Sequence, residues 1–113
     1  MGKAQRAKGY RFERAVVNDL KDIYGEQVRR GWQSRFGSDA PDVEGTPYWI
    51  ECKHHKRVSI KQALKQATED SEKSKEPRTP LAICKDDGKD AIAVMYWSDL
   101  VELLRKVEFK DES

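Results

Sequence analysis

Cysteine is scarce in this sequence, and long apolar runs are absent. Two cysteines among 113 residues, Cys52 and Cys84, exclude a disulfide framework. Both lie in apolar, strand-like runs, which favours buried and reduced thiols. No stretch approaches the ~18 consecutive apolar residues of a membrane span, and the basic N-terminus has no apolar signal core. We therefore expect a cytoplasmic protein without a membrane partner.

Internal repeats and low-complexity linkers are also missing. A length of 113 residues then predicts one domain that spans 1–113. A chain of this size buries roughly two-thirds of its unfolded surface, which is enough for one core.

Acidic residues are unevenly distributed along the chain. Residues 1–65 carry 14 Lys and Arg against 8 Asp and Glu, a net charge of +6, whereas residues 66–113 carry 8 against 12, a net charge of −4. From Lys53 to Thr68 there is no acid. A polyanionic partner would find its footprint in the first half, although charge alone fits an ordinary solvated surface equally well.

Periodicity in the first half predicts one helix and three strands. Residues 3–24 form the helix, with an apolar stripe of Phe12, Val16, Leu20 and Ile23. A first strand at 27–36 is interrupted near Gly31, a short second strand begins at Asp42, and a third covers 48–54.

Periodicity in the second half predicts a helix, two strands and a final helix. The helix at 58–74 has Ser59 as its N-cap. Strands at 81–85 and 91–97 flank a hairpin turn, and the second is so apolar that we expect it to be buried on both faces. Ser98 or Asp99 caps the final helix. The order α-β-β-β-α-β-β-α predicts an α/β fold with a mixed five-stranded sheet flanked by helices.

The stretch from Ala40 to Lys53 contains the candidate chemistry. Glu51 and Lys53 are two residues apart, so they point to one face of a strand, and Asp42 precedes them after a proline. An acid-x-Lys triplet alone is weak in a chain that is 37% charged. Here it follows an apolar run and has a Pro-Asp upstream. Two carboxylates beside a lysine can hold a divalent cation and activate water for phosphodiester hydrolysis.

Several neighbouring residues allow two interpretations. Glu13 lies at the edge of the buried helix face or, alternatively, is an exposed partner for the arginines beside it. The run from Cys52 to His55 suggests zinc, but no second cysteine or histidine pair has a usable spacing. The tryptophans could stack on bases, but we expect core packing, above all for Trp97.

Together, these residues resemble the PD-(D/E)xK nuclease superfamily. The resemblance rests on Glu13 in a basic helix, a loop with Ser34 and Ser38, Pro41-Asp42, and Glu51-x-Lys53. The runs 8–14 and 37–42 are more narrowly similar to archaeal-type Holliday junction resolvases and their phage relatives. The similarity covers residues 8–97 and implies a restriction-endonuclease-like core, in a protein of the cytoplasm or, if phage-encoded, of the host cytoplasm.

The resemblance also implies roles for individual residues. Asp42, Glu51 and the backbone carbonyl of Cys52 would bind Mg²⁺ (or Mn²⁺), with Glu13 completing the cluster directly or through water. Lys53 would orient or activate the attacking water, and Ser38, favoured over Ser34, would contact the scissile phosphate. Together with the acid-free basic run, the resemblance assigns DNA contacts to Lys8, Arg11, Arg14, Arg30, Arg35, Ser34, His54, His55, Lys56, Arg57, Lys61, Gln62, Lys65 and Gln66, with the choice between the two glutamines open.

Three functions remain on these grounds. The first is a homodimeric endodeoxyribonuclease that resolves four-way junctions by paired symmetric nicks and leaves 5′-phosphates, because a two-fold substrate needs two active sites. The fifth strand and the final helix are the candidate dimer surface. The second is another small nuclease of the superfamily, acting on flaps or damaged DNA. The third is a DNA-binding protein without catalysis.

Overall fold

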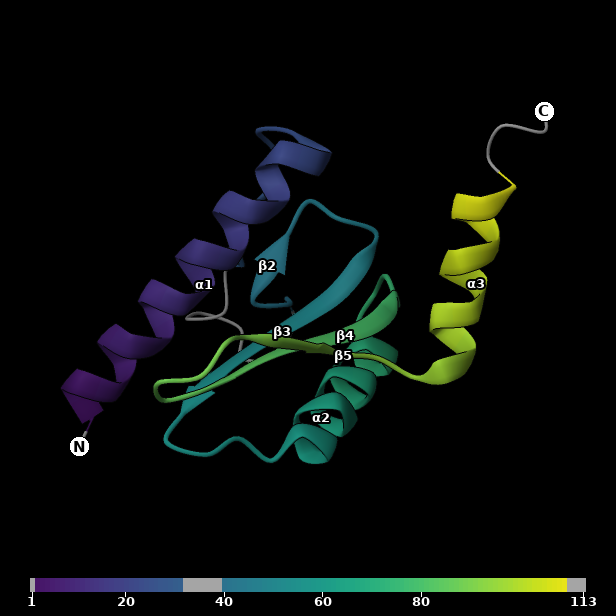
Figure 1. Ribbon diagram of the computed structural model, residues 1–113. Helices are drawn as coiled ribbons and strands as arrows, with labels where there is room; N and C mark the ends of the chain where they lie inside the picture. Colours follow the sequence, from purple (N-terminus) through teal and green to yellow (C-terminus); the bar gives the residue numbers. More distant parts are fainter. Residues whose placement is uncertain (1, 32–39, 110–113) are drawn as a thin grey trace.

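The computed structural model describes residues 2–31 and 40–109 (Figure 1). The order of its elements is the predicted one, and the predicted α/β fold with a mixed five-stranded sheet between helices is confirmed. The elements are α1 (Gly2–Tyr24), β1 (Arg29–Arg30), β2 (Val43–Glu44), β3 (Tyr48–His55), α2 (Ile60–Lys73), β4 (Thr79–Asp86), β5 (Ile92–Val94) and α3 (Trp97–Glu108).

The sheet runs in the order β1-β2-β3-β4-β5, so each strand lies beside its neighbour in sequence. β3 and β4 are parallel and are joined through α2, whereas the other three pairs are antiparallel. The turn between β4 and β5 contains Gly88 at φ +74°, a left-handed conformation that glycine adopts without strain.

Two apolar clusters hold the helices to opposite faces of the sheet. α1 packs on the face that presents Ile50 and Cys52 of β3, and α2 packs on the face that presents Ala82 and Cys84 of β4. Both cysteines are buried and free, as expected. Because side chains alternate along a strand, Glu51 points to the face opposite Ile50 and Cys52. The strand that carries Glu51 is therefore anchored from both sides.

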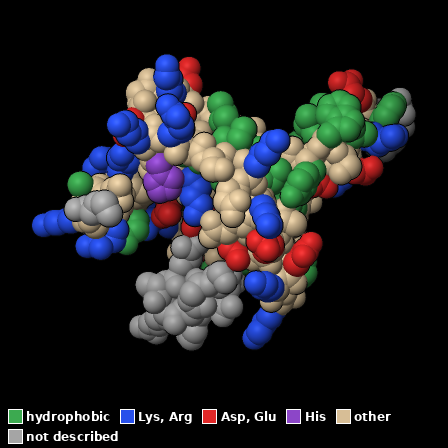
Figure 2. Space-filling model, turned by 90° about the horizontal axis from the view of Figure 1, so that it is seen from below, with side chains coloured by type: hydrophobic (Ala, Val, Ile, Leu, Met, Phe, Trp, Pro, Cys, Tyr) green, Lys and Arg blue, Asp and Glu red, His purple; other side chains and the backbone are tan. Residues whose placement is uncertain are grey.

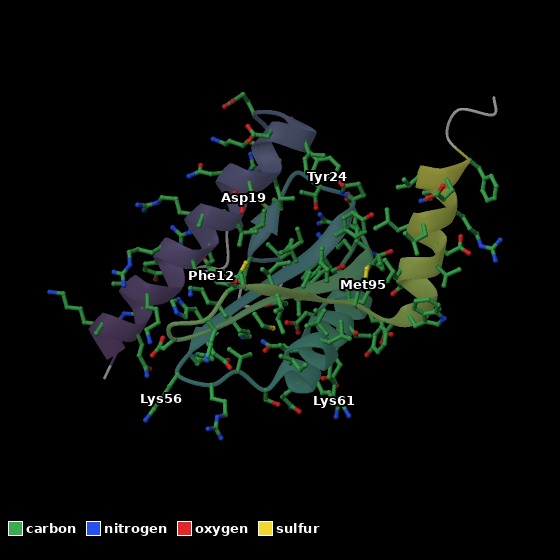
Figure 3. All side chains as sticks on the ribbon, viewed as in Figure 1. Phe12, Asp19, Tyr24, Lys56, Lys61 and Met95 are labelled. Atoms are coloured by element: carbon green, nitrogen blue, oxygen red, sulfur yellow. The ribbon has the colours of Figure 1, made fainter. Side chains whose placement is uncertain are left out.

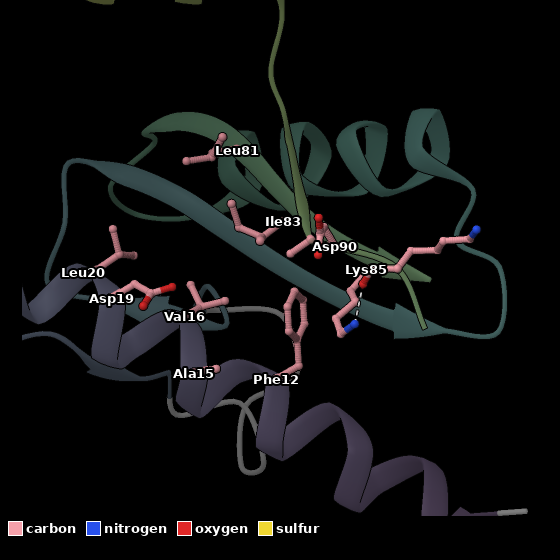
Figure 4. A pocket seen from close by; sticks show the side chains of 11 residues that line it. Phe12, Ala15, Val16, Asp19, Leu20, Leu81, Ile83, Lys85 and Asp90 are labelled. Atoms are coloured by element: carbon pink, nitrogen blue, oxygen red, sulfur yellow. Dashed lines mark hydrogen bonds between the residues drawn. The ribbon is translucent and has the colours of Figure 1, made fainter. Parts of the chain in front are cut away.

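An apolar hollow of about 430 Å³ remains between α1 and β4 (Figure 4). Its apolar wall comes from both elements, and Lys85 donates a hydrogen bond to the carbonyl of Lys89 at one end. It lies on the sheet face opposite Glu51, so it is not part of the site described below. Its lining includes Phe12, Val16, Leu20, Leu81, Ile83, Asp19, Lys85, Lys89 and Asp90.

Gly31 follows β1 at the predicted interruption and allows a close approach of two backbones. Its N–H donates to the carbonyl of Asp42 at 2.7 Å. A Cβ atom at this position would lie only 1.7 Å from the carbonyl oxygen of Pro41, so no larger residue fits without moving the Pro-Asp segment. The rest of the first predicted strand, from 32 to 36, lies outside the described residues.

The C-terminal part departs from prediction. The fifth strand is short, and its residues are exposed or half-buried, so the prediction of burial on both faces is wrong. Among the described residues it is an edge strand that pairs with β4 alone. An apolar run does not reveal whether a second neighbour exists. No residue of α3 is buried within the described part of the chain, and Figure 1 shows this helix projecting from the sheet.

Three local expectations fail for related reasons. Trp97 is 72% exposed rather than in the core, because the described residues leave it uncovered at the start of α3. The residue at the N-cap of that helix is Tyr96, not Ser98 or Asp99. Ile23 is 71% exposed because it lies in the last turn of α1. No helix among the described residues is long and apolar enough to cross a membrane.

Candidate active site

Pairing of β2 with β3 brings Asp42 and Glu51 together. Val43 is the register partner of Ile50, and the backbone N–H of Asp42 donates to the carbonyl of Ile50 at 2.8 Å. The Asp42 carboxylate in turn accepts the backbone N–H of Cys52, with an N to Oδ2 distance of 2.7 Å. Both acids are buried, with 6% and 4% of their surface exposed. Two carboxylates that are separated in sequence therefore lie close together and are shielded from water.

Burial beside a like charge perturbs Glu51. Burial and then the charge of Asp42 raise the pKa of Glu51 from 4.5 to about 8. A hydrogen bond from Trp49 Nε1 to Glu51 Oε1, 3.1 Å long, and the charge of Lys53 oppose this rise in pKa. Neighbouring buried carboxylates do not both stay ionised unless positive charge compensates them. A proton or a cation can therefore relieve the repulsion between the two carboxylates.

Glu13 of α1 adds a third carboxylate to the cluster. Its Oε1 accepts a hydrogen bond from Arg30 Nε at 3.0 Å, and the Arg30 guanidinium lies 4.4 Å from the centre of the Tyr10 ring. Burial and the charge of Asp42 raise the pKa of Glu13, whereas Arg30 and Lys53 lower it. The interpretation of Glu13 as an exposed partner for its helix neighbours is therefore wrong. Glu13 pairs across to β1 and is coupled to the acidic cluster.

The sequence matches the model of a known protein family over almost its whole length. Residues 4–111 match the model of the family described as phage putative PDDEXK endonuclease. The chain belongs to this family. No curated protein and no solved structure matches it. Membership confirms the resemblance to the PD-(D/E)xK superfamily and makes the protein a metal-dependent nuclease with a restriction-endonuclease-like fold, without distinguishing junction resolvases from other members.

The acidic cluster of this PDDEXK endonuclease fits a hard divalent cation. Carboxylate oxygens are ligands that Mg²⁺ and Mn²⁺ prefer, and Mg²⁺ needs only one or two carboxylates beside water and substrate phosphate. Asp42 and Glu51 provide two, and a cation would relieve their repulsion. Among residues 2–31 and 40–109, no three His, Cys, Asp or Glu side chains form a ligand group on their own. Water and phosphate would therefore have to complete the coordination.

The other candidate ligands of this PDDEXK endonuclease do not suit zinc. Burial raises the pKa of the Cys52 thiol, which disfavours the thiolate that zinc binds. His54 Nε2 instead lies 3.2 Å from Asp87 Oδ1. The Cys52 backbone remains next to the Asp42 carboxylate, as its hydrogen bond shows.

Basic residues predicted to contact DNA fall into two groups. His55, Lys56 and Arg57 are exposed and line an open hollow at the end of β3, and Figure 2 shows Lys and Arg side chains gathered around histidine at this end of the molecule. Lys8 differs, because its Nζ contacts both carboxylate oxygens of Asp87 at 2.8 and 3.0 Å. The side chains of the first group therefore expose positive charge to solvent, whereas Lys8 and His54 both lie beside the carboxylate of Asp87.

Of the remaining predicted contacts, Arg30 lies on β1 and the others lie on helices or outside the described residues. Exposed side chains of α1 include Arg11 and Arg14. Lys56 and Lys61 point away from the sheet in Figure 3. Ser34, Arg35 and Ser38 fall within 32–39, outside the described residues. α2 exposes Lys61, Gln62, Lys65 and Gln66, and both glutamines remain candidates.

Sequence reasoning missed two residues around the site. Trp49, which we expected only to fill the core, also donates a hydrogen bond to Glu51, and its position two residues earlier on the same strand was the available signal. Asp87 binds Lys8 across 79 positions of sequence, which no local pattern reveals.

Proposed function

We propose that this protein is a Mg²⁺-dependent (or Mn²⁺-dependent) endodeoxyribonuclease that cuts branched DNA and resolves four-way junctions. The observation that carries the proposal is the buried pair of Asp42 and Glu51, with Lys53 two residues further along the strand. Burying two like charges side by side costs free energy, so such a pair is not expected without a bound group that offsets the cost. In a metal-dependent nuclease the pair can bind the cation that the reaction needs.

In this mechanism the residues of the chain would bind the cation and orient the attacking water. A bound Mg²⁺ would supply positive charge near the phosphoryl oxygens and lower the pKa of water. Asp42 and Glu51 would hold it through their carboxylates, with the backbone carbonyl of Cys52 as a further ligand and Glu13 joining directly or through water. Lys53 orients the attacking water and stabilises developing negative charge. Cleavage leaves a 5′-phosphate and a 3′-hydroxyl.

DNA binding is assigned to the basic end of the molecule. His55, Lys56 and Arg57 line the hollow beside the end of β3 and can neutralise phosphates. In the proposal, Arg11, Arg14, Arg30, Ser34, Arg35, Ser38 and the polar side of α2 extend this surface. Contacts of this kind to phosphates carry no sequence information, which favours reading of DNA shape over reading of sequence.

A homodimer completes the proposal. A four-way junction has approximate two-fold symmetry, so paired nicks need two active sites in a C₂ arrangement. Exposed apolar side chains of α3 and of its C-cap support self-association, since Trp97 is 72% exposed, Val107 61% and Phe109 57%. The protein would act in the cytoplasm, or in that of the host if a phage encodes it.

One set of cleavage assays tests the function. Purified protein is incubated with a four-way junction, a flap and a linear duplex in Mg²⁺, and separately in EDTA. We expect junction cutting that EDTA abolishes. Asp42→Ala should reduce cutting by about a thousandfold or more, because several kcal/mol of transition-state stabilisation are lost, while junction binding remains. Asp22→Ala, an exposed acid on α1, is the matched control and should cut normally.

Each other outcome has a definite meaning. Cutting that persists in EDTA contradicts the metal mechanism. A preference for the flap assigns the protein to flap or damage processing, and equal cutting of linear duplex contradicts structure selectivity. Binding without cutting of any substrate leaves a DNA-binding protein and overturns the proposal.

A further inference from the structure

We propose that Trp49 is a positioning residue that holds the Glu51 carboxylate ready for the cation, and that Arg78 braces Trp49 in turn. This inference rests on the proposed metal-dependent function. Trp49 and Glu51 are alternate residues of β3, so their side chains leave the same face of the strand. The indole Nε1–H donates to Glu51 Oε1 at 3.1 Å, and the tryptophan is only 1% exposed.

The chemistry of the indole suits this task. Its N–H donates and cannot accept or lose a proton in the ordinary pH range. It therefore fixes one oxygen of Glu51 without bringing a positive charge that would compete with a metal ion. The second oxygen and the negative charge remain for the cation. Groups that orient ligands in this way are a regular part of metal sites, and their loss weakens metal binding by about 10–100-fold.

Arg78 fixes the other side of the indole ring. Its Cζ atom lies 5.5 Å from the ring centre, a cation–π distance. The backbone of Arg78 is held by Ser71 at the end of α2: its N–H donates to Ser71 Oγ at 2.7 Å, and Ser71 Oγ–H donates to its carbonyl at 2.6 Å. One guanidinium nitrogen also reaches the carbonyl of Thr46 at 3.4 Å.

The position of the guanidinium is not explained by hydrogen bonding alone. Within the described residues, Arg78 Nε is buried and has no hydrogen-bond partner. A buried, unsatisfied donor is costly, so the stacking on Trp49 must offset that cost or the arrangement would relax. A ring held by the end of α2, the β2–β3 turn and the start of β4 cannot shift easily. The hydrogen bond from the indole N–H to Glu51 then restrains the carboxylate as well.

Trp49→Phe tests the proposal because phenylalanine keeps an aromatic ring but lacks the N–H. Binding of Mg²⁺ and Mn²⁺ is measured by calorimetry on the free protein, together with cleavage as a function of metal concentration. We expect metal affinity to fall by about 10–100-fold. The metal concentration for half-maximal cutting should rise similarly, with most of the rate recovered at saturation. Arg78→Met should weaken binding in the same direction but less.

Controls separate positioning from general destabilisation. Ile50→Val loosens the same strand on its opposite face and should leave metal affinity unchanged, even where its unfolding midpoint falls as far as that of Trp49→Phe. If folded Trp49→Phe binds metal as tightly as the wild-type protein does, the inference is wrong. If Glu51→Gln also binds metal as wild type does, the proposed function fails as well, so the two failures are distinguishable.

A second measurement applies if Trp49→Phe does not fold. In Trp32→Phe/Trp97→Phe, Trp49 is the one tryptophan left, and Tb³⁺ is the metal probe. We expect tryptophan-sensitised Tb³⁺ emission that Glu51→Gln abolishes, because the ring and the ion share one carboxylate. Bound Tb³⁺ without sensitised emission would show that the ion lies away from Trp49 and would overturn the inference.

Discussion

The acidic cluster beside β3 and the helix α3 depart from ordinary burial in opposite directions. At the cluster, Asp42 and Glu51 are 6% and 4% exposed although both are acids. On α3, Trp97 and Val107 are 72% and 61% exposed although both are apolar. Buried charge and exposed apolar surface each carry a free-energy cost. Each therefore favours the binding of a further group, a cation at the acids and an apolar surface at α3.

The two regions differ in how closely the chain itself determines which group binds there. Hydrogen bonds from β1, β3 and the backbone of Cys52 fix the acids in place. On α3, by contrast, the described residues leave every side chain exposed or only half-buried. A braced cluster of oxygen atoms specifies its ligand closely, as a small hard cation. An unbraced apolar helix specifies only that a surface should cover it, which is why the chemistry is better defined than the assembly.

The largest predicted effect concerns the stability of the acidic pair without metal. Because the pKa of Glu51 is raised from 4.5 to about 8, between these values the folded protein keeps a proton that the unfolded chain has released. The contribution of Glu51 to the free energy of unfolding should therefore be highest below pH 4.5 and fall as pH rises towards 8, by at most about 1.4 kcal/mol per pH unit. Above that range the loss is complete.

Urea unfolding in EDTA across this pH range measures the effect. Glu51→Gln should remove most of the fall, and added Mg²⁺ should offset it increasingly as pH rises, because the cation replaces the proton. Glu69→Gln, an exposed acid on α2, should behave as wild type does. Identical pH profiles for wild type and Glu51→Gln would show that the pair carries no electrostatic strain.

A smaller effect is expected at α3. Leu104 and Val107 are 44% and 61% exposed on this helix, and Leu104→Asp should place a charge in the proposed dimer surface. A central contact is worth about 2 kcal/mol, so the dimer dissociation constant should rise roughly thirtyfold. Sedimentation equilibrium measures it, with Lys106→Gln as an exposed control on the same helix. A wild-type protein that stays monomeric at micromolar concentration would contradict the homodimer.

The contrast between the acidic cluster and α3 also explains which features could be predicted from the sequence. Strand alternation and the Pro-Asp pattern were enough to pair Asp42 with Glu51, because both signals are local. Helical periodicity predicted α3 but not its surroundings, because an apolar stripe identifies a face and not the partner that covers it. β5 failed for the same reason, since a run of apolar residues fits an edge strand and a central strand alike.

Contacts between distant residues were out of reach. The pair of Glu13 and Arg30 depends on where α1 crosses β1. The brace of Trp49 by Arg78 depends on how α2 returns to β4. Neither has a sequence period, and a charged residue in a chain this rich in charge has many possible partners.

The smallest predicted effect concerns Asp87, which lies among basic residues at the end of the molecule opposite α3. Its carboxylate contacts Lys8 and lies 3.2 Å from His54 Nε2, so it competes with any phosphate for both. Asp87→Asn should strengthen DNA binding modestly, and each additional phosphate that the protein neutralises should steepen the salt dependence of binding by about 0.9 in log–log slope. Titrations of a labelled junction at several salt concentrations measure both, with Asp90→Asn on the same turn as the control. Unchanged affinity and slope would mean that Lys8 and His54 only tie the β4–β5 turn to α1 and β3. The DNA surface would then consist of basic residues that form no salt bridge within the described part of the chain, beginning with Lys56 and Arg57.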